Sequence, residues 1–346
     1  IEAIVSACED PYMSKPLSEI LYQFQKELHK SDDYICIVIS DATRAIPTKI
    51  LLQAIDTILQ KTSIPDMRIK ILIANGLHRK TTPKELKEII GRDFLTRFDV
   101  INHDATDHLN LTYIGENNLG NSIYLNSVYL EAKIKILTGN VEPHFFAGFS
   151  GGRKSIVPGI AGKETIMQNH SGKNIASPLA RFGILKDNPV YEDAQQTMKM
   201  TDIEPDFMIN VCGNQKHEIT KISTGSYPAH DVLVQFQKQI AFFSVSNQYD
   251  VVVCGNGGYP LDQNLYQAVK SMAIGKIAVK PNGTIIAINK CQNGLGDPNF
   301  EKILKSGLSP QQITSEIMKR KKHSSEHWQI QVLSRILDYA NIITLS

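Results

Sequence analysis

Residues 34–44 read Y-I-C-I-V-I-S-D-A-T-R, an apolar run rich in β-branched side chains that gives way at once to polar ones. An apolar run of this length is typical of a strand that is buried on both faces of a parallel sheet. Apolar residues recur at helical spacing in Pro16–Lys30, before this run, and in Thr48–Gln60, after it. We therefore expect a helix on either side of a buried strand.

The same alternation continues along the chain. Further strands are predicted at Ile69–Ala74, Asp99–Asn102, Ile134–Thr138, Tyr249–Cys254 and Gly283–Ile288, and further helices at Thr82–Ile90, Thr165–His170, Ala229–Ile240 and Asn264–Ala273. Strands that alternate with helices indicate an α/β fold with mainly parallel sheets. Because 346 residues are long for one core, we predict two α/β domains, 1–240 and 241–346.

The overall composition narrows the class of protein. A net charge of +2 gives no basis for nucleic-acid binding, and no apolar run is long enough to span a membrane. The five cysteines include no C-x-x-C pair, and Cys36 and Cys254 lie in apolar runs. This pattern argues against disulfides and zinc-thiolate sites, so we expect a reducing, cytoplasmic location.

Polar residues follow four of the predicted strands. The loops are S-D-A-T-R (40–44), N-G-L-H-R (75–79), G-N-V-E-P-H (139–144) and G-N-G-G-Y-P (255–260). In open α/β sheets, ligands bind outside the carboxyl ends of the strands. We therefore expect these loops to converge and form the site of an enzyme.

Asp41 and Arg44, in the first of these loops, allow two interpretations. Asp41 could cap the helix that follows, with Arg44 exposed to solvent. Alternatively, the Arg44 guanidinium could bind a carboxylate or phosphate through two hydrogen bonds, beside the positive end of that helix.

His78 and His144 each follow a predicted strand. A lone histidine at such a place is more often structural than catalytic. Imidazole titrates near neutral pH, however, so two histidines that face each other can act as acid and base on opposite sides of a substrate carbon. Racemisation needs such a pair, because each enantiomer uses the two groups in opposite senses.

The segment between Thr138 and His170 combines many glycines with buried aromatic residues and titratable groups. Lys154 follows Gly151-Gly152-Arg153, which is either a phosphate-binding turn or the setting of a nucleophilic lysine that could link to a cofactor. The spacing excludes a P-loop. His170 could ligate a metal, but only if a cofactor supplies most of the other ligands.

Tyr266 and Gln267 lie four and three residues before Lys270 on the predicted helix Asn264–Ala273, so they share a helix face with it. On a surface helix this would be unremarkable. Because the helix follows a glycine-rich strand end, contact with a substrate is the alternative.

Together these residues resemble the nickel-pincer-dependent lactate racemase family, which comprises racemases and epimerases of 2-hydroxy acids. The matching segments are S-D-A-T-R (40–44), A-N-G-L-H-R (74–79), T-G-N-V-E-P-H-F-F-A-G-F-S-G-G-R-K-S-I-V-P-G-I-A-G (138–162), N-H (169–170), N-P-V (188–190) and G-G-Y-P-L-D-Q-N-L-Y-Q-A-V-K (257–270). They span about two thirds of the chain in the family's order, and the long central segment is the most specific.

The resemblance implies two α/β domains flanking a central cleft, with 1–240 carrying the cofactor site and 241–346 closing the substrate cleft. It implies racemisation of lactate or a related 2-hydroxy acid by reversible hydride transfer to a nickel complex of pyridinium-3-thioamide-5-thiocarboxylic acid mononucleotide, which cofactor-biosynthesis enzymes would supply. By this likeness Lys154 would hold the cofactor covalently, His170 would be a nickel ligand, and Asp41 and Thr43 would lie close to the cofactor. His78 and His144 would be the acid/base pair. The substrate would be bound by Arg44, Tyr266, Gln267 and Lys270.

Two other functions remain to be weighed. A non-catalytic homologue could bind a nucleotide or organic acid as a sensor or carrier, but the presence of Lys154, His170, His78 and His144 argues against this. A nicotinamide dehydrogenase is disfavoured, because the first strand lacks G-x-G-x-x-G and G-N-G-G at 255–258 has the wrong spacing.

Overall fold

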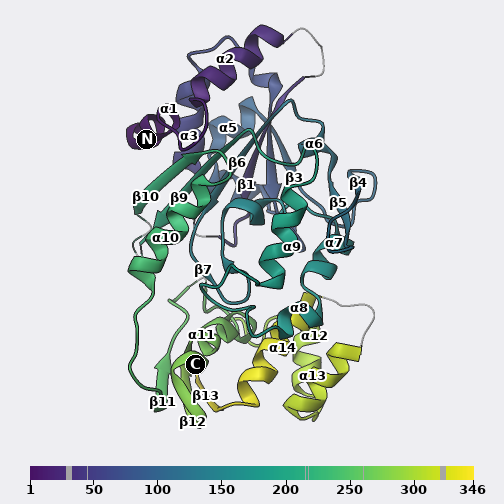
Figure 1. Cartoon of the computed structure of the whole chain (residues 1–346), viewed down its shortest axis with the longest axis vertical. Helices are drawn as coiled ribbons and strands as arrows, with labels where there is room; N and C mark the ends of the chain where they lie inside the picture. Colours follow the sequence, from purple (N-terminus) through teal and green to yellow (C-terminus); the bar gives the residue numbers. More distant parts are fainter. Residues whose placement is uncertain (29–32, 45, 215, 217, 260, 320–324) are drawn as a thin grey trace. The chain divides into compact units, whose positions relative to one another are not determined.

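The computed structural model describes the chain except for residues 29–32, 45, 215, 217, 260 and 320–324, and it divides into two compact units (Figure 1). The first unit comprises Ile1–Pro143, Phe149–Asn169 and Tyr191–Phe242. The second comprises His144–Gly148, His170–Val190 and Phe243–Ser346. Two short segments from the middle of the chain thus belong to the second unit.

A six-stranded sheet forms the centre of the first unit. Its strands are β1 (Ile35–Ser40), β2 (Ile69–Ala74), β3 (Asp99–Asn102), β6 (Ile134–Asn140), β9 (Phe207–Gly213) and β10 (Ile219–Gly225). They lie in the order β10-β9-β6-β1-β2-β3, and all neighbours are parallel except β9 and β10. The predicted α/β fold with mainly parallel strands is confirmed.

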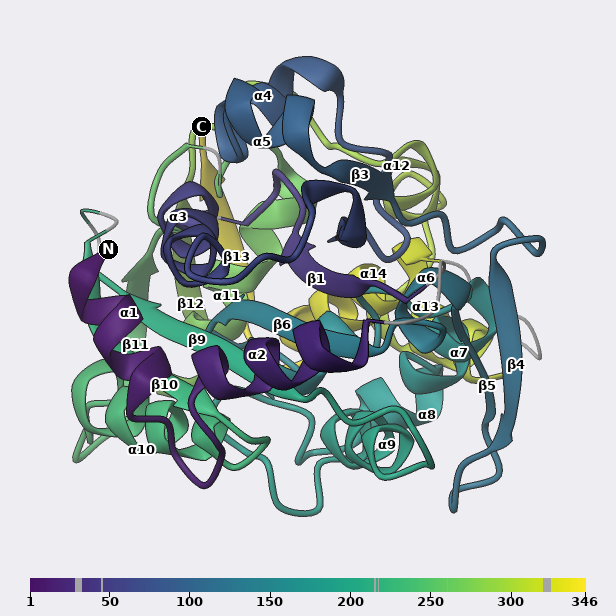
Figure 2. The same ribbon diagram turned by 90° about the horizontal axis from the view of Figure 1, so that it is seen from above.

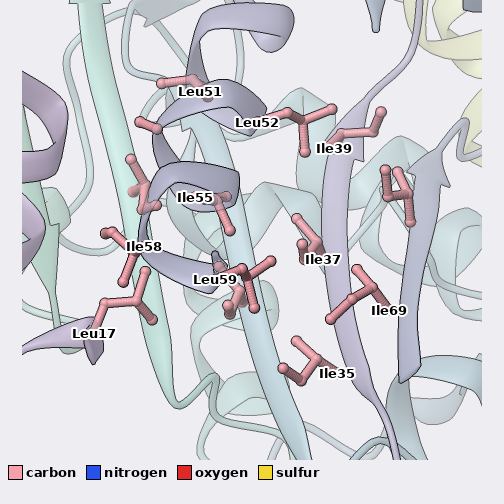
Figure 3. Close-up of a cluster of buried hydrophobic side chains, with 14 of the residues drawn as sticks. Leu17, Ile35, Ile37, Ile39, Leu51, Leu52, Ile55, Ile58, Leu59 and Ile69 are labelled. Carbon is pink, nitrogen blue, oxygen red and sulfur yellow. The ribbon is translucent and has the colours of Figure 1, made fainter. Parts of the chain in front are cut away.

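β1 is a central strand because both of its faces are apolar. Ile35, Ile37 and Ile39 belong to one buried cluster, with helices α1 (Glu2–Glu9), α2 (Leu17–Glu27), α3 (Thr48–Leu59), α4 (Pro83–Ile89) and α5 (Arg92–Arg97). Figure 3 shows these isoleucines beside the apolar face of α3. Cys36 and Val38, which alternate with them, are buried as well and point to the other face. Helix α10 (Ala229–Ala241) packs on β9 and β10, on the opposite side from α3 (Figure 2).

The parallel pairing of three strands brings the predicted loops of this unit to one edge. Ser40 at the end of β1 is in register with Ala74 at the end of β2, and Val38 of β1 is opposite Leu137 of β6. The loops after β1, β2 and β6 therefore leave the sheet at the same edge, as expected.

The other elements of the first unit are η1 (Asp66–Arg68), β4 (Leu111–Glu116), β5 (Ser122–Asn126), α6 (Ser127–Leu130), η2 (Gly152–Ser155) and α7 (Lys163–Asn169). Three further elements each include residues of both units: β7 (Pro143–His144), β8 (Gly148–Phe149) and α9 (Pro189–Met198). The β4–β5 hairpin was not predicted, because β4 is largely exposed and lacks an alternating apolar pattern.

The second unit contains a three-stranded parallel sheet, β11 (Tyr249–Cys254), β12 (Val279–Ile288) and β13 (Asn341–Leu345), in that order. Its helices are α8 (Gly172–Ala176), α11 (Leu265–Ala278), α12 (Pro298–Leu304), α13 (Pro310–Lys319) and α14 (Ser325–Leu337). A separate apolar core, with Met272 of α11, Ile285 of β12 and Ile336 of α14, holds it together. The fourth predicted loop follows β11 and thus belongs to this smaller sheet.

Among the described residues, no helix has the length and apolar character needed to cross a membrane.

Candidate active site

Asp41 is the buried centre of the loop after β1. It is only 4% exposed, and its Oδ1 accepts hydrogen bonds from the Thr43 hydroxyl (2.7 Å) and backbone N–H (3.1 Å). Its Oδ2 lies 2.6 Å from Nδ1 of His78, in the loop after β2. Asp41 does not cap a helix, because α3 begins after Pro47 without a side-chain cap. The interpretation of Asp41 as a helix cap is wrong.

The surroundings of Asp41 keep its carboxyl group ionised. Burial opposes ionisation, but the hydrogen bond and charge of His78, together with the charge of Arg44, outweigh it and hold the pKa of Asp41 below its usual value. Arg44 is half-buried, and within the described part of the chain its guanidinium makes no hydrogen bond or ion pair with another side chain. It therefore remains available to an anionic ligand.

The orientation of His78 is set from two sides. Its backbone N–H donates to the Asn75 carbonyl oxygen (2.9 Å), and the buried Asn75 side chain donates to Asn102 Oδ1 and to the His103 carbonyl oxygen (2.9 and 3.0 Å). The ring itself is fixed by Asp41, and the side chain is 49% exposed. An ionised carboxylate can only accept, so Nδ1 of His78 carries the proton and Nε2 has the lone pair. His78 can thus take up a proton at Nε2.

Lys154 lies on η2, in a loop that covers the ends of the central strands. Ser155 donates to the Thr138 carbonyl oxygen of β6 (3.2 Å), and the Gly76 N–H, two residues before His78, donates to the Gly159 carbonyl oxygen (2.9 Å). Gly76 has φ +54, and a Cβ there would lie 3.3 Å from the Pro158 carbonyl oxygen, so this close approach favours glycine. The loops of Lys154 and His78 are therefore fastened to each other.

A buried cation with a spare donor stands next to Lys154. Arg153 is 2% exposed; its Nη2 donates to the Tyr227 hydroxyl (2.6 Å), and its guanidinium lies 4.0 Å from the Tyr191 ring centroid. Arg153 Nε and Nδ2 of Asn210 are buried and have no hydrogen-bond partner among the described residues, and Asn210 Oδ1 accepts from the Gly152 N–H (3.1 Å). Buried donors of this kind suit a ligand with acidic oxygens, such as a nucleotide phosphate.

Sequence reasoning identified Arg153 as the second cation, beside Lys154, of a possible phosphate-binding turn. Tyr191 and Tyr227 were missed, because they lie 38 and 74 residues beyond Arg153 and no local pattern links them. An arginine beside two glycines, in a segment otherwise rich in apolar residues, was the one available signal that it would need buried partners.

His144 belongs to the second unit and sits among aromatic rings. It is 9% exposed, and its Nδ1 accepts from the backbone N–H groups of Ala147 (3.2 Å) and Phe146 (3.5 Å). Its ring lies 4.6 Å from that of Phe146, edge to face. His170 is another edge-on neighbour of Phe146, at 4.9 Å.

His170 is the first residue of the second unit after α7. The predicted helix was expected to include it, but α7 ends at Asn169. His170 is 6% exposed, and its ring lies 4.8 Å from that of Trp328 on α14. Nowhere in the described chain do three His, Cys, Asp or Glu side chains group as a metal site. A metal bound by His170 would therefore take its other ligands from a bound group, as the imidazole chemistry allows.

Helix α11 carries the other predicted substrate residues. The Asn264 side chain caps it by accepting from the Gln267 N–H (2.9 Å). The Lys270 ammonium lies 5.9 Å from the ring centroid of Phe145, which in turn contacts His144 at 5.0 Å. Tyr266 packs edge-on against Phe300 of α12. Lys270 and His144 thus share one aromatic neighbour.

The predicted residues fall into two groups. Asp41, Thr43, Arg44, His78 and Lys154 lie in the first unit. His144, His170, Tyr266, Gln267 and Lys270 lie in the second. Asp41 contacts both Thr43 and His78 in the first group, and His144 and His170 share the neighbour Phe146 in the second. The joint action of the two groups is a prediction.

Comparison with known proteins gives consistent results along the whole chain. Residues 1–183 match the lactate racemase N-terminal domain, and residues 245–346 match the lactate racemase C-terminal domain. The lactate racemase of Thermoanaerobacterium thermosaccharolyticum is 36% identical over 349 residues, which cover 100% of this chain and 79% of that protein. The lactate racemase of Lactiplantibacillus plantarum is 37% identical, over 93% of this chain and 76% of that protein.

Comparison with solved structures agrees with these sequence matches. The lactate racemase apoprotein of T. thermosaccharolyticum superposes with a TM-score of 0.89 at 35% identity, covering 99% of this chain and 80% of that one. A Thermotoga maritima protein shares the fold, with a TM-score of 0.69 at 18% identity over 97% of this chain and 88% of that one. With both domains matched and a third of the residues identical along the whole chain, this protein belongs to the lactate racemase family.

Proposed function

We propose that this chain is an isomerase that racemises or epimerises a 2-hydroxy acid, lactate or a related acid, with a nickel-pincer nucleotide as cofactor. The observation that carries the proposal is the Asp41–His78 pair at the sheet edge, fastened to the loop of Lys154 through Gly76 and Gly159. A proton acceptor and a lysine suited to covalent attachment are thereby held on one framework. The family membership supports the same reaction class.

The bound cofactor would supply a centre that accepts and returns the C2 hydrogen of the substrate as hydride. The protein then has to move only the hydroxyl proton. His78 takes that proton at Nε2, where its lone pair is held by the bond from Nδ1 to Asp41. His144 is the second member of the pair, and the two exchange roles between enantiomers.

The remaining residues bind and orient. Arg44 and Lys270 hold the substrate carboxylate, since a guanidinium and an ammonium both favour an anion, with Tyr266 and Gln267 beside Lys270 on α11. A carboxylate bound by both Arg44 and Lys270 keeps the oxidised substrate from diffusing out of the site.

Lys154 and His170 hold the cofactor in this proposal. The amine of Lys154, a half-buried residue, would be the point of covalent attachment, and His170 would contribute a nitrogen ligand to nickel. Arg153 Nε and Asn210 Nδ2 offer donors to the phosphate. Asp41 and Thr43, which the family likeness places near the cofactor, act here through His78.

The proposal extends to the partners and the location of the protein. Loading of the cofactor requires the enzymes that make it, so we propose these as partners. All five cysteines are free, which supports the reducing, cytoplasmic location expected from the sequence.

The role of Lys154 predicts a covalent adduct that depends on one amine. In protein co-expressed with the cofactor-making enzymes, Lys154→Ala and Lys154→Arg should both abolish the adduct, because a guanidinium cannot replace the amine in that bond. Intact-mass spectrometry measures this, with Lys163→Arg as the matched control that keeps the adduct. An adduct that survives in the Lys154 variants refutes the assignment.

The histidine pair predicts a symmetrical loss of rate. Removing a positioned acid or base costs about 10²–10⁴-fold, so His78→Gln and His144→Gln should each lower racemisation by that factor while the adduct remains. Enantiomers have equal free energies, so kcat/KM must fall equally in both directions. His108→Gln, on an exposed histidine, is the control. A histidine variant with full adduct and near wild-type rate would assign that residue to the scaffold.

The lowered pKa of Asp41 predicts a pH-dependent contribution to stability. A carboxylate whose folded pKa is depressed stabilises the protein above its unfolded pKa of about 3.9 and loses this effect as the pH falls through the folded value. Wild type should therefore exceed Asp41→Asn by about 1–3 kcal/mol in free energy of unfolding at neutral pH, and the gap should close in acid. Urea titrations at a series of pH values measure it.

Asp250→Asn, at an exposed carboxylate paired with Lys280, is the control and should show a much smaller gap. A gap for Asp41→Asn that persists undiminished in acid contradicts the role given to its charge.

A further inference from the structure

The backbone holds His144 in one tautomer. Its Nδ1 lies 3.2 Å from the Ala147 nitrogen and 3.5 Å from the Phe146 nitrogen. A backbone N–H can only donate, so Nδ1 must be the acceptor in both contacts. The neutral ring of His144 therefore carries its proton on Nε2.

His78 has the opposite arrangement. The ionised Asp41 carboxylate can only accept, so the 2.6 Å contact requires the proton on Nδ1 of His78. The neutral ring then has its lone pair on Nε2. Both assignments follow from partners whose donor or acceptor role is fixed, which is the sound basis for assigning a histidine tautomer.

The amides that fix His144 depend on a buried asparagine. Asn188 is fully buried, and its Nδ2 donates to the carbonyl oxygens of Phe146 and Ile184, both at 2.9 Å. Its Oδ1 accepts from the Val190 N–H (3.1 Å). One side chain thus ties the short segment 144–148 to residues 184–190.

The fit between these segments is tight. The Gly183 N–H donates to the Gly148 carbonyl oxygen (3.1 Å). Gly148 has φ +80, and a Cβ there would lie 2.2 Å from the Ile184 carbonyl oxygen. The segment 144–148 therefore has little room for another backbone conformation, and the Asn188 side chain holds its Phe146 carbonyl group in place.

We propose that Asn188 is a positioning residue for His144: it aims the Phe146 and Ala147 amides at Nδ1, so that the two histidines of the site rest in opposite tautomers. Its bearing on catalysis rests on the proposed function. In the neutral rings, His78 has its lone pair at Nε2 and can act there as a base directly. His144 has an N–H at Nε2, so it can act as acid or base there only once Nδ1 carries a proton and has given up its two amide contacts.

The same contacts couple proton uptake to the backbone. A second proton on His144 has to go to Nδ1, where it faces the N–H groups of Ala147 and Phe146. The charged form of His144 therefore requires the segment 144–148 to give up these contacts. His78 faces no such conflict, because Asp41 accepts its Nδ1 proton in either charge state.

The tautomers can be read directly in the cofactor-free full chain. Protein labelled with ¹⁵N-histidine, held well above the imidazole pKa of about 6.5, gives long-range ¹H–¹⁵N correlations that distinguish protonated from unprotonated ring nitrogens. His78→Gln and His144→Gln assign the signals. We expect a protonated Nε2 in His144 and a protonated Nδ1 in His78. A protonated Nδ1 in His144 overturns the inference.

Variants of Asn188 test its role. Asn188→Asp and Asn188→Ser both remove the two N–H donors, the second without adding a charge, so the single-tautomer pattern of His144 should be lost while that of His78 stays. Asn289→Asp is the control, a buried asparagine of the same unit that contacts Asn256 and Ser271 instead. If either folded Asn188 variant keeps the wild-type His144 pattern, Asn188 does not position it.

These outcomes separate the inference from the proposed function. The predicted tautomers in a protein that loads cofactor but does not racemise would uphold the inference and overturn the function. Racemisation by a protein whose His144 carries its proton on Nδ1 would do the reverse.

Discussion

Parallel pairing of β1 with β6 on one side and β2 on the other is the constraint on which the site in the first unit depends. Parallel strands end at the same edge, so the sheet brings the loops of Asp41 and His78 there. Hydrogen bonds of Ser155 and Gly76 then hold the segment of Lys154 against these loops. The apolar run of β1 makes this possible, because only a strand buried on both faces can sit in the middle of such a sheet.

Hydrogen bonds between these loops then fix the positions and the proton-bearing atoms of the side chains that the sheet brings close together. The Asp41–His78 contact fixes which ring nitrogen carries the proton, and the Gly76–Gly159 contact joins the loop of His78 to that of Lys154. In the second unit the same task falls to backbone amides and Asn188, which fix His144 from its own segment. A carboxylate and a pair of amides thus impose opposite proton positions on two chemically identical rings.

Much of the architecture was predictable because strands and helices follow from local patterns of apolar residues. The limits of β2, β3 and β11 agree with their predicted spans, since each is centred on apolar, mostly β-branched residues. The loops after the strands were predictable for the same reason. The partner of Asp41 was not: a helix cap and a cofactor contact were both considered, whereas the bond to His78 joins positions 37 residues apart. The contacts of Asn188 and Tyr227 were not predicted, because buried polar pairing depends on tertiary distance, for which one sequence has no periodic signal.

The central claim is that the histidines move only the hydroxyl proton, while the C2 hydrogen leaves and returns as hydride. Racemisation of one lactate enantiomer by the cofactor-loaded protein in deuterium oxide tests this most directly, because a proton removed from C2 would exchange with solvent and a hydride would not. Mass spectrometry of the separated enantiomers should find hydrogen retained at C2 in both. Deuterium at C2 of the product would contradict the account.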